Sequence, residues 1–483
     1  MSAKPHIYLI PVMAPGHMIP MVDLARKLAR LGARSTIITT PLNASHFFRT
    51  IERDRKDGFE VAISIVEFPC QEAGLPAGCE NLSSTTTSEM TFKFIKAMDL
   101  FQEPVEKLLQ DGDPNCIVAG AFFWWANDVA ARLNIPRLVF YGTGCFPMCV
   151  SKCLKMHKEN GLLDSEEFVV PGLPDEVKMS RRQLPEEFKE EDKSPFAETY
   201  KKIVAAESRS FGMVVNTFQE LEPAYVRLMQ ELMGIKIWNV GPISLFYGSI
   251  EDKAHRGREA SVNDDHQDCL NWLNSKKPDS VVYICFGSMA RFSSSQLVEI
   301  AEGLRASGRE FIWVVGELAG DDEWSPEGFE RRLEGKGLII TGWAPQVLIL
   351  EHEAVGGFIT HCGWNSLLEG VAGGVPMVTW PLSAEQFFNE KFVVEILKIG
   401  IPVGVREWTR RTQEREAVKR EDVEKAMRRL MGEEEGDELR IRAKNLRDSA
   451  ITAVQKDGSS DMDLKCLIQE IRVYPESSHF SEV

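Results

Sequence analysis

The stretch AVGGFITHCGWNSLLEGVAGG, residues 354–374, decides how the rest of the sequence is understood. Its apolar beginning, 354–360, predicts a buried β-strand, and its end predicts a helix. The turn between them contains Gly363, surrounded by His361, Trp364, Asn365 and Ser366. A glycine turn that enters a helix leaves free N–H groups at the helix N-terminus, where the helix dipole favours phosphate. At the carboxyl end of a parallel strand this turn predicts an anion site, whereas helix capping would explain only one of its polar side chains.

Alternating strand and helix patterns extend outward from this stretch in both directions. On its N-terminal side, seven apolar runs predict strands, from HIYLIPV (6–12) to KIWNVGP (236–242). After an irregular stretch the rhythm restarts, with six strands expected between 280–288 and 401–405. This alternation is typical of parallel sheets with helices on both faces. We therefore expect an α/β protein of two Rossmann-like, doubly wound domains facing one another.

The length of 483 residues also favours two domains. We expect a first domain at 1–245 and a second at 265–460. The polar stretch 246–264 between them is predicted to be a linker. The last segment, 461–483, is predicted to be a helix and tail that pack back on the first domain.

Composition excludes several classes of protein. The net charge of -16 argues against a nucleic-acid partner, because phosphate binding needs a basic face. No apolar run reaches the length of a membrane span, and the N-terminal run lacks a cleavage site. The ten cysteines form no Cys-x-x-Cys pair, which favours thiols in a reducing compartment. We expect a cytoplasmic protein that acts as a monomer.

Several cofactor and metal motifs are missing. The first strand is followed by APGHMIPM instead of the glycine fingerprint of dinucleotide sites. His352-Glu353 begins a zinc-type H-E-x-x-H pattern, but Gly356 stands where the second histidine would be. The pair Asp111-Gly-Asp113 is followed by proline and favours a turn. No cofactor and no metal ion are expected.

The segment from Trp343 to Gln386, WAPQVLILEHEAVGGFITHCGWNSLLEGVAGGVPMVTWPLSAEQ, identifies a family. Over its 44 residues it resembles the signature box of the plant secondary-product UDP-glycosyltransferases. The resemblance implies the GT-B architecture, in which the two domains enclose a cleft. It also implies an inverting, metal-independent transfer from a UDP-sugar to a small-molecule acceptor. The group that it resembles most acts on flavonoids, triterpenes, steroids and related scaffolds.

The resemblance implies a UDP-sugar site that is spread over the second domain and one position of the first. Trp343 would stack on uracil, as aromatic faces do on bases, and Glu369 would accept from the ribose diol. Gln386 corresponds to a glutamine associated with glucose, so UDP-glucose is the expected donor. Ser288 also fits the alternative of a simple turn residue. The full set is Thr143, Ser288, Trp343, Ala344, Gln346, His361, Gly363, Trp364, Asn365, Ser366, Glu369, Glu385 and Gln386.

His17, in MAPGH, resembles the catalytic base of the family, and with Phe122 and Ala384 it is expected to contact the acceptor. The base has to take the hydroxyl proton near pH 7, which suits histidine. The family pairs this histidine with an aspartate that orients the imidazole, as in a hydrolase triad. In CIVAGAFFWW (116–125) that position is Gly120.

The missing carboxylate leaves two hypotheses open. The first is an active glycosyltransferase that lacks the relay residue. The second is a nucleotide-sugar-binding protein with weak or lost catalysis. An unrelated Rossmann enzyme is disfavoured, because the glycine fingerprint is absent.

Overall fold

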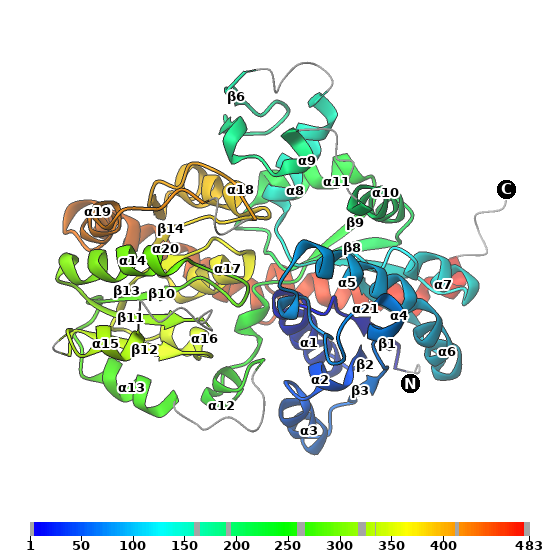
Figure 1. Cartoon of the computed structure of the whole chain (residues 1–483). Helices are drawn as coiled ribbons and strands as arrows, with labels where there is room; N and C mark the ends of the chain where they lie inside the picture. Colours follow the sequence, from blue (N-terminus) through cyan, green and yellow to red (C-terminus); the bar gives the residue numbers. More distant parts are fainter. Residues whose placement is uncertain are drawn as a thin grey trace. The chain divides into compact units, whose positions relative to one another are not determined.

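The strand-forming runs of the sequence assemble into two separate parallel sheets (Figure 1). The computed structural model describes residues 4–158, 165–189, 195–257, 266–316, 325–333, 335–410 and 415–477. Contacts divide the chain into two units. The first comprises Met1–Gly144, Lys193–Val262 and Thr452–Val483, and the second comprises Cys145–Asp192 and Asn263–Ile451.

The first unit contains a seven-stranded parallel sheet with the order β3-β2-β1-β4-β5-β8-β9. Winding starts at β1 and reverses direction between β1 and β4, so the carboxyl ends of these two strands flank the switch point where ligands bind in such sheets. The strands are β1 (His6–Ile10), β2 (Arg34–Thr39), β3 (Val61–Ile65), β4 (Cys116–Gly120), β5 (Arg137–Tyr141), β8 (Gly212–Val215) and β9 (Lys236–Asn239).

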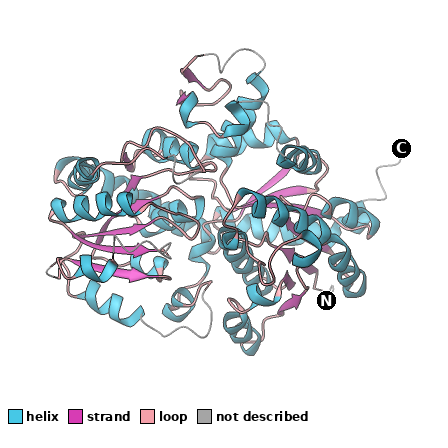
Figure 2. Cartoon of the chain, viewed as in Figure 1, coloured by secondary structure: helices cyan, strands magenta, loops and turns pink. Residues whose placement is uncertain are grey.

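Helices surround this sheet, as the cyan ribbons in Figure 2 show. Helix α1 starts at Pro15, which suits the first helical position because its missing N–H needs no partner there. Its buried face includes Met18, Met21 and Leu28, which are three and seven residues apart and so lie on one side of the helix. The helices are α1 (Pro15–Arg30), α2 (Pro41–Ala44), α3 (Phe48–Lys56), α4 (Cys70–Ala73), α5 (Ser88–Leu100), α6 (Gln102–Gly112), α7 (Ala126–Arg132), α10 (Pro195–Glu207), α11 (Pro223–Met233), α12 (Ile250–Ala254) and α21 (Ser459–Ser477).

The end of the chain belongs to the core of the first unit. Leu464, Leu467, Ile468 and Ile471 of α21 are buried in the same apolar cluster as β1 and β4. At the edge of the sheet, Lys236 of β9 pairs with Glu470 at 2.5 Å.

The second unit contains a six-stranded parallel sheet with the order β12-β11-β10-β13-β14-β15. Winding starts at β10 and reverses between β10 and β13, so the stretch that opened the sequence analysis lies at the switch point of this sheet. The strands are β10 (Val281–Cys285), β11 (Glu310–Val315), β12 (Gly337–Thr341), β13 (Val355–Thr360), β14 (Met377–Thr379) and β15 (Gly400–Pro402).

Helices and one hairpin complete the second unit. Strands β6 (Glu167–Val169) and β7 (Lys178–Ser180) pair antiparallel. Cys145, Cys149 and Cys153 share the buried face of α8, as their spacing predicts. The helices are α8 (Cys145–His157), α9 (Glu186–Lys189), α13 (His266–Asn274), α14 (Ser294–Ser307), α15 (Pro326–Glu330), α16 (Gln346–Leu350), α17 (Trp364–Gly373), α18 (Gln386–Lys391), α19 (Arg420–Leu430) and α20 (Glu434–Val454), with a π-helix at Phe392–Ile396.

The predicted fold class is confirmed, since all thirteen expected strands lie in the two sheets. The division of the chain differs from the predicted boundaries in three places. Residues 145–192 group with the second unit, residues 452–460 group with the first, and 246–262 of the predicted linker also group with the first. Within the described part of the chain, no helix is long and apolar enough to cross a membrane.

The stretch predicted as an irregular linker, 246–264, contains the short helix α12; its residues 258–264 lie outside the described ranges. Asp252 of α12 accepts hydrogen bonds from Arg26 at 2.7 Å and from Arg53 at 2.6 Å. Arg26 in turn pairs with the buried Asp54. These ion pairs hold α12 against α1 and α3 of the first unit.

Candidate functional site

The predicted donor residues of the second unit follow the carboxyl ends of four of its strands. Ser288 comes after β10, Trp343 and Ala344 after β12, and the turn 361–363 after β13. Glu385 and Gln386 follow β14 and begin α18. Because β10, β13 and β14 are neighbours in the sheet, their carboxyl-end loops share one edge.

The turn before α17 is shaped around the ring of His361. A Cβ atom added to Gly287 would lie 2.7 Å from Cε1 of this ring, and one added to Gly363 would lie 2.4 Å from Nε2. Cys362, between His361 and Gly363 in the sequence, adopts a left-handed backbone with φ 65°. Only glycine leaves room on both sides, so the FGS turn after β10 and the turn after β13 pack against one imidazole.

The polar groups of this turn suit an anion. Gly363 is the N-cap of α17, and as a glycine it has no side chain to cap the helix. The Nδ1 atom of His361 is buried and has no hydrogen-bond partner within the described ranges. Burial lowers the pKa of His361 to about 4, so the ring is neutral at pH 7 and can donate one hydrogen bond. A bound diphosphate would satisfy both the helix end and the ring.

Gln346, Ser366 and Glu369 are joined in one hydrogen-bond network. The amide nitrogen of Gln346 donates to Glu369 at 2.6 Å and to Ser366 at 3.3 Å. Its carbonyl oxygen accepts from the hydroxyl of Tyr283 at 3.3 Å. Tyr283 was not predicted as part of the site. Trp343, two residues beyond β12, is 40% exposed, while Ala344 beside it is buried.

A second network joins the turn to the predicted sugar-binding residues. The buried side chain of Asn389 donates to the carbonyl of Cys362 at 2.9 Å and to the Glu385 carboxylate at 3.4 Å. Burial raises the pKa of Glu385. The side-chain oxygen of Gln386 accepts from the backbone N–H groups of Leu382 and Ser383.

Trp364 and Ala384, two further predicted residues, contact other parts of the second unit. Trp364 is buried with its ring centroid 6.1 Å from that of Phe392. Ala384 is exposed in a left-handed conformation with φ 51°, and its carbonyl accepts from Trp408 at 2.9 Å.

The remaining predicted residues, His17, Gly120, Phe122 and Thr143, lie in the first unit at the carboxyl edge of its sheet. His17 is in the first turn of α1. The Phe122 ring meets it edge-on, with centroids 6.4 Å apart and an angle of 88°. A Cβ atom on Gly142 would be 3.0 Å from Nδ1 of His17, so the end of β5 closes the other side. Thr143 follows, and its buried hydroxyl forms no hydrogen bond to the part of the chain that the structure describes.

The orienting nitrogen of His17 is also buried, and none of the residues that the structure describes is its hydrogen-bond partner. Desolvation lowers the pKa of His17 to about 4, so the ring is a neutral base at pH 7. Gly120 supplies no acceptor for this nitrogen. A Cβ atom there would lie 2.6 Å from Cγ2 of Val12, a separation that atoms do not tolerate. Val12 therefore closes the space that a side chain at this position would need.

Three contributors to these arrangements were missed by the sequence analysis: Tyr283, Asn389 and Val12. Asn389 could have been found, because it lies four residues after Glu385 on the same helix face. Tyr283 and Val12 carry no signal in the local sequence, since their contacts are made between strands and loops far apart in the chain.

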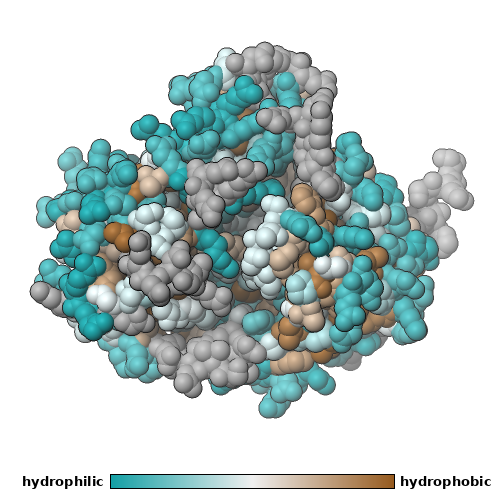
Figure 3. Space-filling model, viewed as in Figure 1, coloured by the Kyte–Doolittle hydropathy of each residue, from teal (hydrophilic) through white to brown (hydrophobic). Residues whose placement is uncertain are grey.

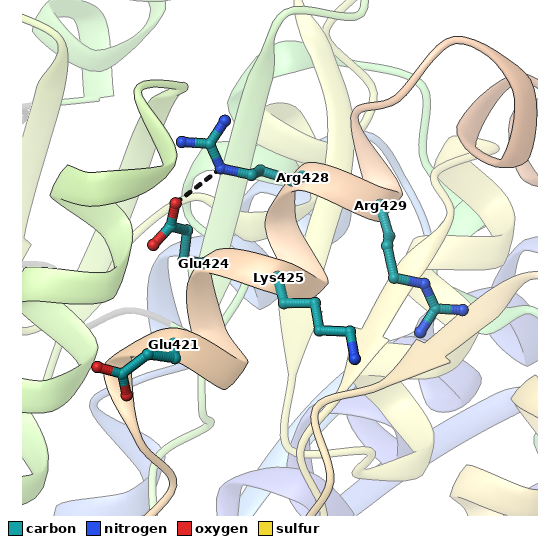
Figure 4. Close-up of a pocket in the computed structure, with 5 residues that line it drawn as sticks. All are labelled: Glu421, Glu424, Lys425, Arg428 and Arg429. Atoms are coloured by element: carbon teal, nitrogen blue, oxygen red, sulfur yellow. Dashed lines mark hydrogen bonds and ion pairs between the residues drawn. The ribbon is translucent and has the colours of Figure 1, made fainter.

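The surface outside the predicted donor residues and the surroundings of His17 has a hollow and an apolar area, which do not suggest another site. A hollow of about 350 Å³ lies on α19, lined by Glu421, Glu424, Lys425, Arg428 and Arg429 (Figure 4). These mixed charges lie along one exposed helix, with Arg428 paired to Glu424, and are typical of a solvated face. On the face in Figure 3 the surface is mainly hydrophilic, and apolar residues gather near α4 and α5. Over the described ranges, no group of three or more His, Cys, Asp or Glu residues could hold a metal ion.

Known proteins resemble this chain over nearly its full length. The family described as "UDP-glucoronosyl and UDP-glucosyl transferase" matches residues 241–435. The chain is 50% identical over 474 residues to UDP-glucose flavonoid 3-O-glucosyltransferase 7 of Fragaria ananassa, covering 96% of each protein. It is 48% identical over 476 residues to scopoletin glucosyltransferase of Nicotiana tabacum, covering 98% of this chain and 99% of the relative.

A solved structure is similar in both units. The crystal structure of Glycyrrhiza uralensis UGT73P12 complexed with glycyrrhetinic acid 3-O-monoglucuronide has a TM-score of 0.92 and 40% sequence identity. The alignment covers 99% of this chain and 97% of that one. The similarity therefore includes the seven-stranded unit. His17 belongs to this unit and lies outside residues 241–435, which the family model matches.

Proposed function

This chain belongs to the plant UDP-glycosyltransferase family and is a UDP-glycosyltransferase, and on that premise we propose that it transfers glucose from UDP-glucose with inversion. The proposed acceptor is a hydroxyl or carboxylate of a plant specialised metabolite, such as a flavonoid, triterpenoid or steroid. Two observations support this class: the resemblance of the signature box and the flavonoid and scopoletin in the names of the two curated relatives.

The observation that carries the proposal is the start of α17. Its uncapped N-terminus lies beside the His361 ring, which is held between Gly287 and Gly363. We assign the diphosphate to this helix end, with hydrogen bonds from His361, Asn365, Ser366 and Ser288. These donors would stabilise the negative charge that grows on UDP as the bond to the sugar breaks.

The rest of the donor fits the neighbouring side chains. The exposed face of Trp343 is suited to stack on uracil, whose edge the backbone of Ala344 would read. Glu369, held by Gln346, would accept from the ribose hydroxyls. For the sugar we propose Glu385, Gln386, Trp364 and Thr143. The oxygen of Gln386 already accepts two backbone N–H groups, so its amide nitrogen is the group that would meet a sugar hydroxyl.

We assign the acceptor's proton to His17. As the acceptor oxygen bonds to C1 of the sugar, the bond between C1 and the diphosphate breaks, the configuration inverts and the proton passes to the imidazole. Phe122 and Ala384 are proposed to contact the acceptor. Because no described residue accepts a hydrogen bond from the orienting nitrogen of His17, the imidazolium that forms would be poorly stabilised.

The same unpartnered nitrogen favours the second candidate, a nucleotide-sugar-binding protein with weak or lost catalysis. The two candidates share every contact of the second unit. They differ only in whether His17 can accept a proton at a useful rate.

The test is mass spectrometry of products from UDP-glucose and a mixed panel of phenols, triterpenes and carboxylic acids, with His17→Ala as the control. We expect glucosides from the natural chain, none on alcohols from His17→Ala, and the same UDP affinity for both by calorimetry. Binding of UDP-glucose without any product would select the second candidate. Loss of UDP affinity in His17→Ala would overturn the role assigned to this histidine.

We propose a reducing compartment such as the cytoplasm, because none of the ten cysteines forms a disulfide. We propose that the protein acts as a monomer on small molecules, without a nucleic-acid partner, in keeping with its net charge of -16.

A further inference from the structure

Tyr283 lies in the middle of β10 with its side chain fully buried. It is the register partner of Phe358 on β13, and the two rings stack with centroids 5.3 Å apart at 22°. Backbone pairing and ring stacking therefore fix the position of the hydroxyl. Burial raises the pKa of Tyr283 well above its ordinary value, so the hydroxyl keeps its proton and can donate.

The orientation of the Gln346 amide follows from its neighbours. A carboxylate only accepts hydrogen bonds, so the amide nitrogen has to face Glu369, at 2.6 Å. The planar amide then directs its oxygen away from Glu369, and this oxygen is the atom that meets the Tyr283 hydroxyl at 3.3 Å. The hydroxyl, the amide and the carboxylate thus form one directed chain of hydrogen bonds from the core to Glu369.

This chain determines which way the Glu369 carboxylate is held. Gln346 is half-buried, and Glu369 is 8% exposed. Without a donor at Tyr283, the amide would lose one of the contacts that fix its plane, and the carboxylate would be held less firmly. A loosely held carboxylate binds a ligand hydroxyl more weakly, because the orientation of the carboxylate then has to be fixed on binding.

We propose that Tyr283 is a positioning residue for donor recognition: through Gln346 it holds the Glu369 carboxylate in the orientation that receives the ribose hydroxyls of UDP-glucose. This inference rests on the proposed function, which places the ribose at Glu369. Tyr283 itself contacts no substrate in this scheme. Its effect should therefore depend on whether the donor carries the ribose hydroxyls.

The test is the variant Tyr283→Phe, assayed with UDP-glucose and with its 2′,3′-dideoxyribose analogue. Loss of one neutral hydrogen bond predicts a KM for UDP-glucose about fivefold higher, with kcat nearly unchanged. With the dideoxy donor, the natural chain and the variant should have equal KM values. An equal rise in KM for both donors, or no rise for either, would overturn the proposal.

Tyr247→Phe is the matched control. Tyr247 is buried in the first unit, and its hydroxyl donates to the carbonyl of Asp23 at 2.7 Å. This variant also loses a buried tyrosine hydrogen bond, so its unfolding temperature should fall by a similar amount while its KM for UDP-glucose stays unchanged.

The outcomes separate this inference from the proposed function. If the natural chain uses both donors equally well, Glu369 does not bind the ribose, and both the assignment of Glu369 and the inference fail. If the natural chain prefers the ribose donor and Tyr283→Phe keeps that preference in full, only the inference fails.

Discussion

Replacing Gly120 by aspartate should restore a partner for His17, but only if Val12 is reduced as well. In the single variant the new Cβ would lie 2.6 Å from Cγ2 of Val12, which is 1% exposed. Valine is stiff at χ1, so this overpacking should cost about 1–3 kcal/mol. The unfolding temperature of the first unit should fall by about 2–4 °C for each kcal/mol.

The double variant Val12→Ala/Gly120→Asp removes the clash. The next atoms of Val12 are its nitrogen at 3.3 Å and its Cβ at 3.6 Å, and both are retained in alanine. A carboxylate that reaches Nδ1 of His17 should orient the ring and stabilise the imidazolium. Loss of such a group in a hydrolase triad lowers kcat about 10,000-fold, which sets the upper limit of the gain.

The gain should depend on the acidity of the acceptor. Carboxylic acids are already ionised at pH 7, and acidic phenols partly so, whereas aliphatic alcohols need a base. We expect kcat/KM on alcohol acceptors to rise in the double variant relative to Val12→Ala, with little change on carboxylate acceptors. Calorimetry of UDP should show unchanged donor binding. A flat or lower rate on alcohols, in a folded double variant, would refute the reasoning and show that the packing of Phe122 and Gly142 already orients His17.

Three further outcomes are expected. His361→Ala should lower kcat/KM for UDP-glucose about 100-fold, as loss of an oxyanion donor does, and a change below about fivefold would remove this ring from the diphosphate site. Because burial lowers the pKa values of His17 and His361 to about 4, kcat/KM should stay level from pH 8 down to about 5, whereas an acid limb near 6.5 would contradict their desolvation. Asn389→Asp replaces the amide group that donates hydrogen bonds to Cys362 and Glu385 by a carboxylate oxygen, which only accepts them. The kcat/KM for UDP-glucose should therefore fall about tenfold or more, while the exposed control Asn445→Asp should leave it unchanged.

Much of the second unit could be predicted because its information is local. The segment 354–374 forms a strand, a glycine turn and a helix that are continuous in sequence, so hydrophobic period and turn chemistry were sufficient. The sheets likewise followed from runs of apolar residues.

The parts that escaped prediction depend on contacts between distant segments. Tyr283 reaches Gln346 across 63 residues. Val12 meets Gly120 only because β1 and β4 are neighbours in the sheet. Residues 145–192 were assigned to the first domain but group with the second unit. Their local sequence does not indicate which of two similar sheets their helices pack against.

The burial of α21 in the first core bears on the order in which the protein can fold during its synthesis. Leu464, Leu467 and Ile471 complete a core that begins with β1, so the unit started first on the ribosome is finished last. The second unit, whose final residue is Ile451, has emerged in full before that core can close. A nascent chain released short of α21 would present an unfilled apolar groove on an otherwise assembled sheet, the kind of surface that chaperones recognise.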